Sequence, residues 1–266
     1  MTRIITIANQ KGGVGKTTTT VNIAAAMAQM GKTVLVIDMD PQGNATTALG
    51  IEHSEGTPGI YNVLMGEITL ADVITLCPDV PQLFGIPATI DLAGAEVELV
   101  STPNREHRLR EEIEKLLRTA HFDYIFLDCP PSLGLLTLNG LVAAREVLLP
   151  IQCEYYALEG LSQLLKTVDM IKEHLNPQLY VTAIILTMYD GRTRLASQVA
   201  DEVRNHFGAR VLETIIPRNV RVSEAPSYGQ TVLTYDPASS GADLVFTWFI
   251  PGLNHRFKPG ANKFIF

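Results

Sequence analysis

Short apolar runs alternate with amphipathic segments along most of the chain. The runs are continuous and rich in branched residues, which is typical of strands buried on both faces of a parallel sheet. They lie at residues 4–8, 34–37, 124–128, 146–151, 180–187 and 211–216, with a weaker run at 82–86. Helices are predicted between them, at residues 21–30, 92–99, 106–118, 158–174 and 196–207. This alternation predicts an α/β fold, a doubly wound, mostly parallel sheet with helices on both faces.

No linker-like stretch interrupts the alternation, so we expect one domain over residues 1–241. The chain of 266 residues is long enough for one large α/β domain with a sizeable core. Residues 242–266 differ, because Pro251 leaves room for only about two turns of helix and the residues after it have no apolar period. We expect an atypical C-terminal tail there. An altered reading frame, a lineage-specific tail and a partner-binding segment are all compatible with it.

The composition is that of a soluble globular protein, with 46% apolar and 18% charged residues. The formal net charge of −7 does not indicate a nucleic-acid binder, so any DNA contact would need a local patch. Cys77, Cys129 and Cys153 are too widely spaced for a redox motif or a thiolate cluster, and they indicate reduced thiols. Neither a signal-peptide pattern nor a run of 18 apolar residues occurs, so we expect a cytoplasmic protein without a membrane partner.

A glycine-rich loop, residues 10–18, joins the first predicted strand to the first predicted helix. Proteins hold phosphates at such junctions, because free backbone amides and the positive end of the helix dipole face the anion. We expect Lys16 to reach the β- and γ-phosphates of a nucleotide and Thr17 to offer its hydroxyl to Mg²⁺. The alternative is a glycine-rich loop without a ligand. The order of strand, loop, Gly-Lys-Thr and helix argues against that alternative.

The loop departs from the usual Walker A pattern. The pattern G-x-x-x-x-G-K-[ST] requires a glycine where this chain has Gln10. Gly12 and Gly13 supply the flexibility instead, and a second lysine, Lys11, stands before them. The departure therefore combines a displaced glycine with an additional positive charge.

Three aspartates stand at the ends of predicted strands. Asp38 and Asp40 are two residues apart, so both are expected on one face at the carboxyl end of the sheet, where open α/β folds bind ligands. Carboxylates there orient an attacking water or the waters around a metal, and a solvated turn is the alternative. Asp128 ends the run at 124–128 as a Walker B aspartate does. We expect it to hold Mg²⁺ through water or to bond to Thr17.

Several longer motifs resemble the ParA/Soj family of chromosome-partitioning ATPases, which have a deviant Walker A loop. They are Asn-Gln-Lys-Gly-Gly-Val-Gly-Lys-Thr-Thr at 9–18, Asp-Met-Asp-Pro-Gln-Gly-Asn at 38–44, Asp-Cys-Pro-Pro-Ser at 128–132 and Ile-Pro-Arg-Asn-Val-Arg at 216–221, together with residues 154–160 and 223–226. The resemblance implies a slow ATPase that uses ATP and Mg²⁺ and forms a homodimer around ATP. It also implies that the dimer binds DNA without sequence preference, and that a ParB-type centromere-binding protein stimulates hydrolysis and releases it.

The resemblance also implies roles for single residues. Lys11 matches the signature lysine that reaches the partner subunit's nucleotide, and Gly12 lies where two subunits approach closely. Asp40 matches the aspartate that positions the attacking water, so the expected catalytic residues are Lys11, Lys16 and Asp40. Thr17 and Asp128 are the expected metal residues. Nucleotide contacts are expected from Lys11, Gly12, Gly13, Val14, Gly15, Lys16, Thr17, Thr18, Pro217 and Asn219.

Two arginines, Arg192 and Arg221, match DNA-contacting positions of the family. Residues 186–225 contain six arginines and five acidic residues, and this near balance is not a basic stripe, so ordinary surface arginines are the alternative. Contacts to DNA phosphates would weaken steeply with salt. DNA binding would place the protein on the nucleoid.

Three other members of the superfamily offer alternative functions. A MinD-like ATPase would bind membrane through a C-terminal amphipathic helix, which Pro251 interrupts. An ATP-dependent ligase or amidase would need a substrate pocket, and no added domain for one is visible. A protein of the nitrogenase iron protein type would need a pair of cluster cysteines, which the cysteine spacing does not supply.

Overall fold

The computed structural model describes residues 1–155, 157–243 and 245. Its centre is an eight-stranded sheet with the strand order β3-β4-β2-β5-β1-β6-β7-β8. Neighbouring strands are parallel except for β3 and β4, which pair in opposite directions. The strands are β1 (Arg3–Ile7), β2 (Val34–Asp38), β3 (Thr75–Leu76), β4 (Leu83–Ile86), β5 (Tyr124–Asp128), β6 (Glu146–Gln152), β7 (Tyr180–Tyr189) and β8 (Val211–Pro217).

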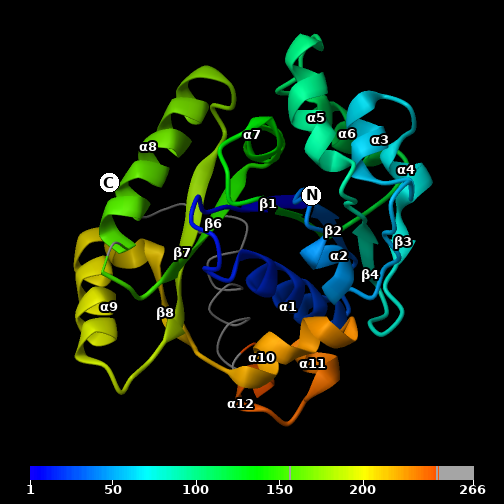
Figure 1. Ribbon diagram of the computed structural model, residues 1–266. Coiled ribbons are helices and arrows are strands. Elements are labelled where there is room, and N and C mark those ends of the chain that lie inside the picture. The colour runs from blue at the N-terminus through cyan, green and yellow to red at the C-terminus, as the bar shows by residue number, and fades with distance from the viewer. Residues whose placement is uncertain (156, 244, 246–266) are drawn as a thin grey trace.

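Helices cover both faces of the sheet (Figure 1), which confirms the predicted doubly wound α/β fold. On one face lie α1, α2 and the short helices near residue 230, and on the other lie α3 to α9. The helices are α1 (Lys16–Gln29), α2 (Asn44–Ala48), α3 (Ile60–Met65), α4 (Leu70–Val73), α5 (Leu92–Glu98), α6 (Arg108–Leu116), α7 (Leu135–Ala143), α8 (Ala157–His174), α9 (Arg194–Phe207), α10 (Val220–Glu224), α11 (Val232–Tyr235) and α12 (Ser240–Asp243), with 3₁₀ turns at 99–101, 208–210 and 225–228.

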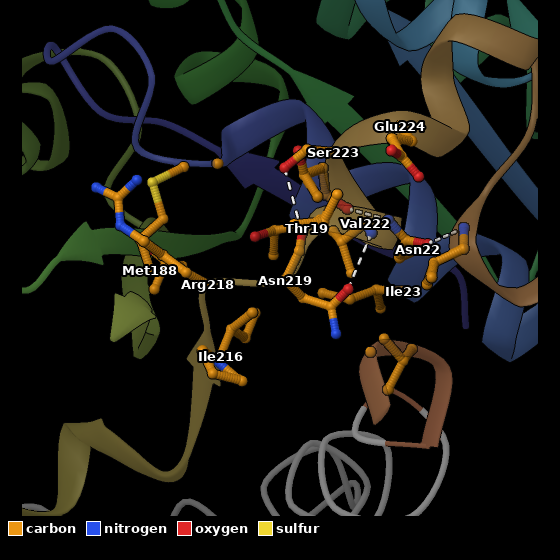
Figure 2. A pocket seen from close by; sticks show the side chains of 18 of the residues that line it. Thr19, Asn22, Ile23, Met188, Ile216, Arg218, Asn219, Val222, Ser223 and Glu224 are labelled. Carbon is orange, nitrogen blue, oxygen red and sulfur yellow. Dashed lines mark hydrogen bonds between the residues drawn. The ribbon is translucent and has the colours of Figure 1, made fainter. Parts of the chain in front are cut away.

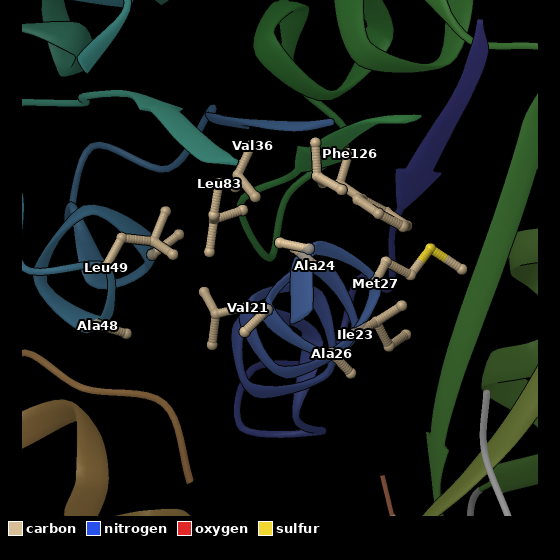
Figure 3. Close-up of a cluster of buried hydrophobic side chains, with 14 of the residues drawn as sticks. Val21, Ile23, Ala24, Ala26, Met27, Val36, Ala48, Leu49, Leu83 and Phe126 are labelled. Carbon is tan, nitrogen blue, oxygen red and sulfur yellow. The ribbon is translucent and has the colours of Figure 1, made fainter. Parts of the chain in front are cut away.

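The alternation of side chains in β2 shows why the strand is apolar throughout. Val34 and Val36 belong to the core under α1, whereas Leu35 and Ile37 belong to the core under α3 to α7. All four are fully buried. Figure 3 shows Val36 facing α1, where small alanines let the helix approach the sheet closely.

Most predicted elements are present, with small shifts in their bounds. The first helix starts at Lys16 rather than at residue 21, because the threonines after the lysine already form its first turn. Helix α7 was not predicted, since its sequence is apolar on nearly all sides and has no helical period. The predicted helical segment before Pro251 falls almost entirely outside the described residues, of which α12 is the last helix.

Candidate functional site

The loop between β1 and α1 is shaped by two glycines in the left-handed region. Gly13 has φ 72° and Gly15 has φ 86°, conformations that side-chain-bearing residues rarely adopt. Gly15 is the N-cap of α1, so no side chain caps the first amides of this helix. The first turn also contains no acidic residue. The amides and the dipole of α1 therefore remain available for an external anion.

The loop is held from both sides by hydrogen bonds. Thr187 of β7 donates its hydroxyl to the carbonyl of Val14 at 2.8 Å. The Asn9 amide donates to the carbonyl of Pro150 at 2.7 Å, and its oxygen accepts from the Lys11 amide at 2.9 Å. These contacts fix the loop before any ligand arrives, which lowers the entropy cost of binding one.

Lys16 lies inside this loop with only 6% of its surface exposed. Its Nζ donates to the carbonyl of Lys11 at 3.4 Å, so the side chain spans the loop. Burial lowers the Lys16 pKa, while the nearby Asp128 and Asp40 carboxylates act in the opposite direction. A buried lysine among backbone amides is suited to a multiply charged phosphate.

Asp128 stands at the floor of the site, fully buried at the end of β5. It accepts hydrogen bonds from two hydroxyls of α1, from Thr17 Oγ1 at 2.6 Å and from Thr20 Oγ1 at 2.9 Å. Burial raises the pKa of Asp128 to about 6, against the opposing effects of these hydrogen bonds and of Lys16. The predicted contact between Thr17 and Asp128 is therefore present.

Asp38 and Asp40 have different surroundings, although the sequence predicts both on one face at the carboxyl end of the sheet. Asp38 is buried beside Asp128 and accepts from the amide and hydroxyl of Thr46, at 2.8 and 2.7 Å. Burial, and then the charge of Asp128, raise the pKa of Asp38 to about 7. Asp40 accepts from the Gln42 amide at 3.0 Å, and its carboxylate is not tied to other side chains by a described hydrogen bond. Asp38 thus shapes the loop that carries Asp40.

The side chain of Lys11 is paired with a residue outside its own phosphate loop. Its ammonium forms an ion pair with the carboxylate of Glu154, which follows β6. About half of each side chain is exposed, 51% for Lys11 and 45% for Glu154. The second lysine of the loop is therefore not part of the floor formed by Lys16, Thr17 and Asp128.

A cavity of about 570 Å³ opens beside the loop. Its walls come from the loop, from α1, from the ends of β7 and β8 and from α10, as Figure 2 shows. Ile23 and Val222 contribute apolar surface, and Met188 and Ile216 line the side formed by the strands. A flat apolar ring attached to a phosphate in the loop would fit such a cavity.

Pro217 and Asn219 line this cavity, and their contact with a base stays a prediction. The Asn219 side chain is the N-cap of α10 and accepts from the amides of Arg221 and Val222, at 2.9 and 3.3 Å. Its amide nitrogen donates to the Ser240 hydroxyl at 3.0 Å. The described contacts of Asn219 therefore hold the wall in shape.

Met188 is a residue of this cavity that sequence reasoning missed. Its φ of 52° lies in the left-handed region, which is unusual for a residue other than glycine or asparagine. Nothing in the sequence of a strand end predicts this conformation. Backbone strain of this kind is common at binding sites, where the surrounding structure enforces it.

The two arginines predicted to contact DNA are both exposed and both paired with carboxylates. Arg192 donates from Nε and from Nη2 to the two oxygens of Asp190, each at 2.8 Å. Arg221 lies 3.0 Å from Glu224 and 3.3 Å from Asp236. Arg192 lines the rim of the cavity, and Arg221 lies on α10 beside it. The structure therefore brings both near the cavity but not into the phosphate loop.

The groups gathered at this loop fit a nucleoside triphosphate with a hard divalent cation. The loop offers free amides and one buried ammonium to phosphate oxygens, and Thr17 and Asp128 offer oxygen atoms, which Mg²⁺ prefers. Within the part of the chain that the structure describes, no group of three or more His, Cys, Asp and Glu side chains forms a metal cage. A cation held by one hydroxyl, waters and phosphate oxygens agrees with that finding.

Similarity to known proteins covers nearly the whole chain. A family model described as an AAA domain matches residues 2–181. The sporulation initiation inhibitor protein Soj of Bacillus subtilis is 53% identical over 244 residues, 92% of this chain and 95% of that protein. The chromosome partitioning protein ParA of Myxococcus xanthus is 53% identical over 241 residues, 91% of this chain and 84% of that protein.

Solved structures share the fold as well. A cobyrinic acid a,c-diamide synthase from Mycobacterium smegmatis, with a bound ATP analogue and magnesium, has a TM-score of 0.84 and 36% identity and covers 96% of this chain and 95% of its own. The cell division ATPase MinD of Pyrococcus furiosus has a TM-score of 0.78 and 25% identity, over 96% of this chain and 99% of its own.

Proposed function

Because the chain belongs to the Soj/ParA family of chromosome-partitioning ATPases, we propose that it is an ATP-hydrolysing switch for chromosome or plasmid segregation. In this proposal the ATP-bound homodimer binds DNA without sequence preference. A ParB-type centromere-binding protein stimulates the slow hydrolysis and so releases the dimer from DNA. The observation that carries the proposal is the division of the loop's two lysines, with Lys16 buried over the floor and Lys11 outside it.

The floor residues bind and orient the nucleotide. Gly13 and Gly15 turn backbone amides toward the phosphates, and Lys16 contributes its charge to the β- and γ-phosphates. Thr17 and Asp128 would hold Mg²⁺, directly and through water. Mg²⁺, when bound, neutralises phosphate charge that develops during transfer. The cavity between α1 and β8 would take the adenine, with Pro217 on its wall.

Asp40 is the proposed catalytic carboxylate. Its carboxylate would accept a hydrogen bond from the attacking water and so orient its lone pair toward the γ-phosphorus. The loop that carries Asp40 is fixed by the bonds from Thr46 to Asp38, so the orientation is built in before the water arrives. In this assignment Asp40 takes part in hydrolysis, and Asp38 holds the loop that carries Asp40.

Lys11 would act on the nucleotide of the second subunit. A cation from the partner subunit neutralises transition-state charge as an arginine finger does. To reach it, Lys11 must leave Glu154. A half-exposed pair of this kind contributes about 0–1 kcal/mol, so contact with a triphosphate would readily replace it. Dimer formation then depends on the γ-phosphate.

DNA binding would use Arg192 and Arg221. Both side chains reach solvent, and their present partners are carboxylates that a DNA phosphate would replace. Exchange of a carboxylate for a phosphate keeps the guanidinium paired throughout, which lowers the cost of the switch. Such contacts predict steep salt dependence.

The test is co-sedimentation with DNA in the presence of ATP, ADP or no nucleotide. We expect binding with ATP alone, and a loss of about tenfold or more in affinity for Arg192→Glu combined with Arg221→Glu. Arg110→Glu, an exposed arginine on α6, is the matched control and should change the affinity little. DNA binding by the double variant at wild-type strength would refute the assignment of these arginines, and equal binding with ADP would refute the switch.

A membrane-positioning role of the MinD type is the alternative. The similarity to MinD structures supports a shared ATPase core, but a membrane-binding helix would have to lie in residues 246–266, outside the described part of the chain. Within that described part, no helix has the length and apolarity to cross a bilayer. A liposome pull-down with ATP, run beside the DNA assay, separates the two functions.

A biosynthetic amidation is less well supported. The diamide synthase is 36% identical, against 53% for the partitioning proteins. An amidase that takes ammonia from glutamine often uses an accessible cysteine thiolate, whereas Cys77, Cys129 and Cys153 are all buried. Burial also raises the pKa of Cys77 to about 12 and that of Cys153 to about 11, which keeps these thiols protonated.

A further inference from the structure

The short helix α12 packs against the wall of the cavity beside the phosphate loop. A Cβ atom added at Gly241 would lie 2.6 Å from Val222 Cγ2 and 3.3 Å from both Cγ and Nδ2 of Asn219. All three residues line the cavity. Figure 2 shows Asn219 and Val222 side by side on this wall. The lack of a side chain at Gly241 therefore lets α12 and the wall approach closely.

Helix α12 is itself fixed to the rest of the molecule. Ala242 is buried and belongs to the core cluster under α1. The Ala242 amide donates to the Ser239 hydroxyl at 3.2 Å, which stabilises the first turn of the helix. Asp236, in the segment before α12, lies 3.3 Å from Arg221 of α10. Both α12 and the phosphate loop are thus anchored on α1, so α12 is a fixed support for the cavity wall.

The hydrogen bonds of the Asn219 side chain leave one polar group free. Its oxygen accepts from the amides of Arg221 and Val222, which occupies both lone pairs. Its nitrogen carries two hydrogens, and one is donated to the Ser240 hydroxyl at 3.0 Å. Among the residues that the structure describes, the second hydrogen has no partner. Because two backbone amides hold the oxygen, the group that Asn219 can still offer is a single N–H donor.

We propose that Ser240 and Gly241 are positioning residues for base recognition. Ser240 holds the Asn219 nitrogen, and Gly241 leaves the room in which this amide lies, so that the remaining N–H meets an acceptor atom of the base. This inference rests on the proposed function, in which the base of the nucleotide fills the cavity. It adds that the wall recognises the base only while α12 supports it from behind.

The free donor restricts which atom of a purine can face Asn219. A free asparagine amide pairs with adenine through two bonds, because its oxygen accepts from the exocyclic amino group and its nitrogen donates to a ring nitrogen. Here α10 occupies the oxygen, so only the second of these bonds is available. The atom opposite Asn219 is therefore an unprotonated ring nitrogen, and the amino group of adenine lies elsewhere.

The test compares ADP with inorganic pyrophosphate, each with Mg²⁺, by isothermal titration calorimetry on the full chain. Pyrophosphate measures the phosphate loop alone, whereas ADP also measures the base cavity. Ser240→Ala should weaken ADP binding by about three- to tenfold and change pyrophosphate binding by less than about twofold, because one hydrogen bond to Asn219 is lost. Ser240→Thr keeps the hydroxyl and should restore ADP affinity. Ser197→Ala, which removes an exposed serine from α9, is the matched control and should match wild type.

Two further variants test the geometry of the wall. Asn219→Asp keeps a capping oxygen for α10 but turns the free donor into an acceptor, so ADP binding should weaken by about tenfold or more. Gly241→Ala inserts a methyl group against Val222 and Asn219, and ADP binding should weaken by about tenfold. Pyrophosphate binding should stay within about twofold of wild type in both variants, since the phosphate loop is unchanged.

Analogues of ADP identify the atom that Asn219 contacts. The 1-deaza, 3-deaza and 7-deaza forms each replace one ring nitrogen with a carbon, which removes one acceptor. One of them should bind wild type about tenfold more weakly than ADP, and should bind Asn219→Asp no more weakly than ADP does. A role of Asn219 in folding alone would not produce this dependence on a single atom of the ligand.

Three results would overturn the inference. They are wild-type ADP affinity in Ser240→Ala, an equal loss of ADP and pyrophosphate binding in Ser240→Ala or Gly241→Ala, and full wild-type affinity for all three deaza analogues. Thermal unfolding of each variant without ligand, at the wild-type temperature, excludes misfolding. Failure of the proposed function gives a different result, because wild type would then bind neither ADP nor pyrophosphate.

Discussion

The floor of the nucleotide site consists of Lys16, Thr17 and Asp128, and by its rim we mean Lys11 with its partner Glu154. The two regions differ in how their charged groups are held. At the floor, Asp128 is fully buried and bonded to Thr17 and Thr20. At the rim, Lys11 is about half exposed and is held by one carboxylate. The floor is preorganised, so its groups need not move when a nucleotide binds. The rim is held by pairs that cost little to open, and it is therefore suited to change partners during a cycle.

The largest expected effect comes from the floor. Lys16→Ala removes the buried ammonium from the phosphates, and we expect both ATP affinity and hydrolysis to fall by about 10²–10³-fold. Isothermal titration with a slowly hydrolysed ATP analogue and a phosphate-release assay measure the two. Lys32→Ala, an exposed lysine beyond the other end of α1, is the control and should match wild type. Wild-type nucleotide affinity in Lys16→Ala would contradict the preorganised floor.

At the rim, binding and hydrolysis should separate. Lys11→Ala should keep ATP affinity within about threefold but lower dimer-dependent hydrolysis by about 10²-fold or more, because the cation in question serves the other subunit. The same two assays, with light scattering for the dimer, measure this. Full ATPase activity in Lys11→Ala would refute the role of the second lysine and remove the distinction between rim and floor.

The buried aspartates predict a pH effect on stability. The folded-state pKa is raised to about 7 for Asp38 and to about 6 for Asp128, above the unfolded value of 3.8. The folded protein then binds more protons than the unfolded chain between about pH 4 and 7, so its stability falls as pH rises through this range. Urea unfolding without nucleotide at pH 5 and at pH 7.5 tests the sign.

A control for this pH effect is the same pair of measurements with magnesium and an ATP analogue. A bound cation favours the charged carboxylates, so the loss of stability toward pH 7.5 should shrink. A nucleotide-free protein that is more stable at pH 7.5 than at pH 5 would contradict the raised pKa values.

The smallest expected effect comes from Glu154. Glu154→Gln frees Lys11 from a half-exposed pair, and ATP-dependent dimer formation should become about two- to fivefold tighter. Analytical ultracentrifugation at several protein concentrations is sensitive enough for this change. Glu159→Gln, an exposed glutamate of α8, is the matched control. A weaker dimer in Glu154→Gln would mean that Glu154 itself contributes to the subunit interface.

Sequence was sufficient for the seven parallel strands and for the position of the floor, but not for the short antiparallel strand β3. Continuous apolar runs predict buried strands because both sheet faces are covered, and Gly-Lys-Thr after a strand locates Lys16, Thr17 and, through topology, Asp128. The different surroundings of Asp38 and Asp40 were not predictable, because they depend on Thr46, which approaches only in the folded chain. Helix α7 was missed because uniform apolarity hides the helical period.

Some other features are indicated by residues close to them in the sequence, and others by nothing in the sequence. Glu224 stands three residues after Arg221 on α10, a spacing at which helical side chains meet. The pairing of Asp190 with Arg192 belongs to a turn, in which the Asp190 carboxylate also accepts from the Arg192 amide. The strained backbone of Met188 has no signal in its residue type, since tertiary packing imposes it. Local chemistry is thus readable from sequence, whereas conformations imposed by distant packing are not.

The stretch of sequence without lysine or arginine, residues 33–104, also determines what standard mapping chemistry can detect. Trypsin cleaves after these two residues, so after Lys32 it finds no further site until Arg105, and residues 33–105 leave the digest as one long fragment. Amine-reactive cross-linkers have no side-chain target there either. Changes in residues 33–104 will therefore be recorded by carboxyl-directed reagents or by pepsin digestion, and lysine-based maps will leave this stretch blank.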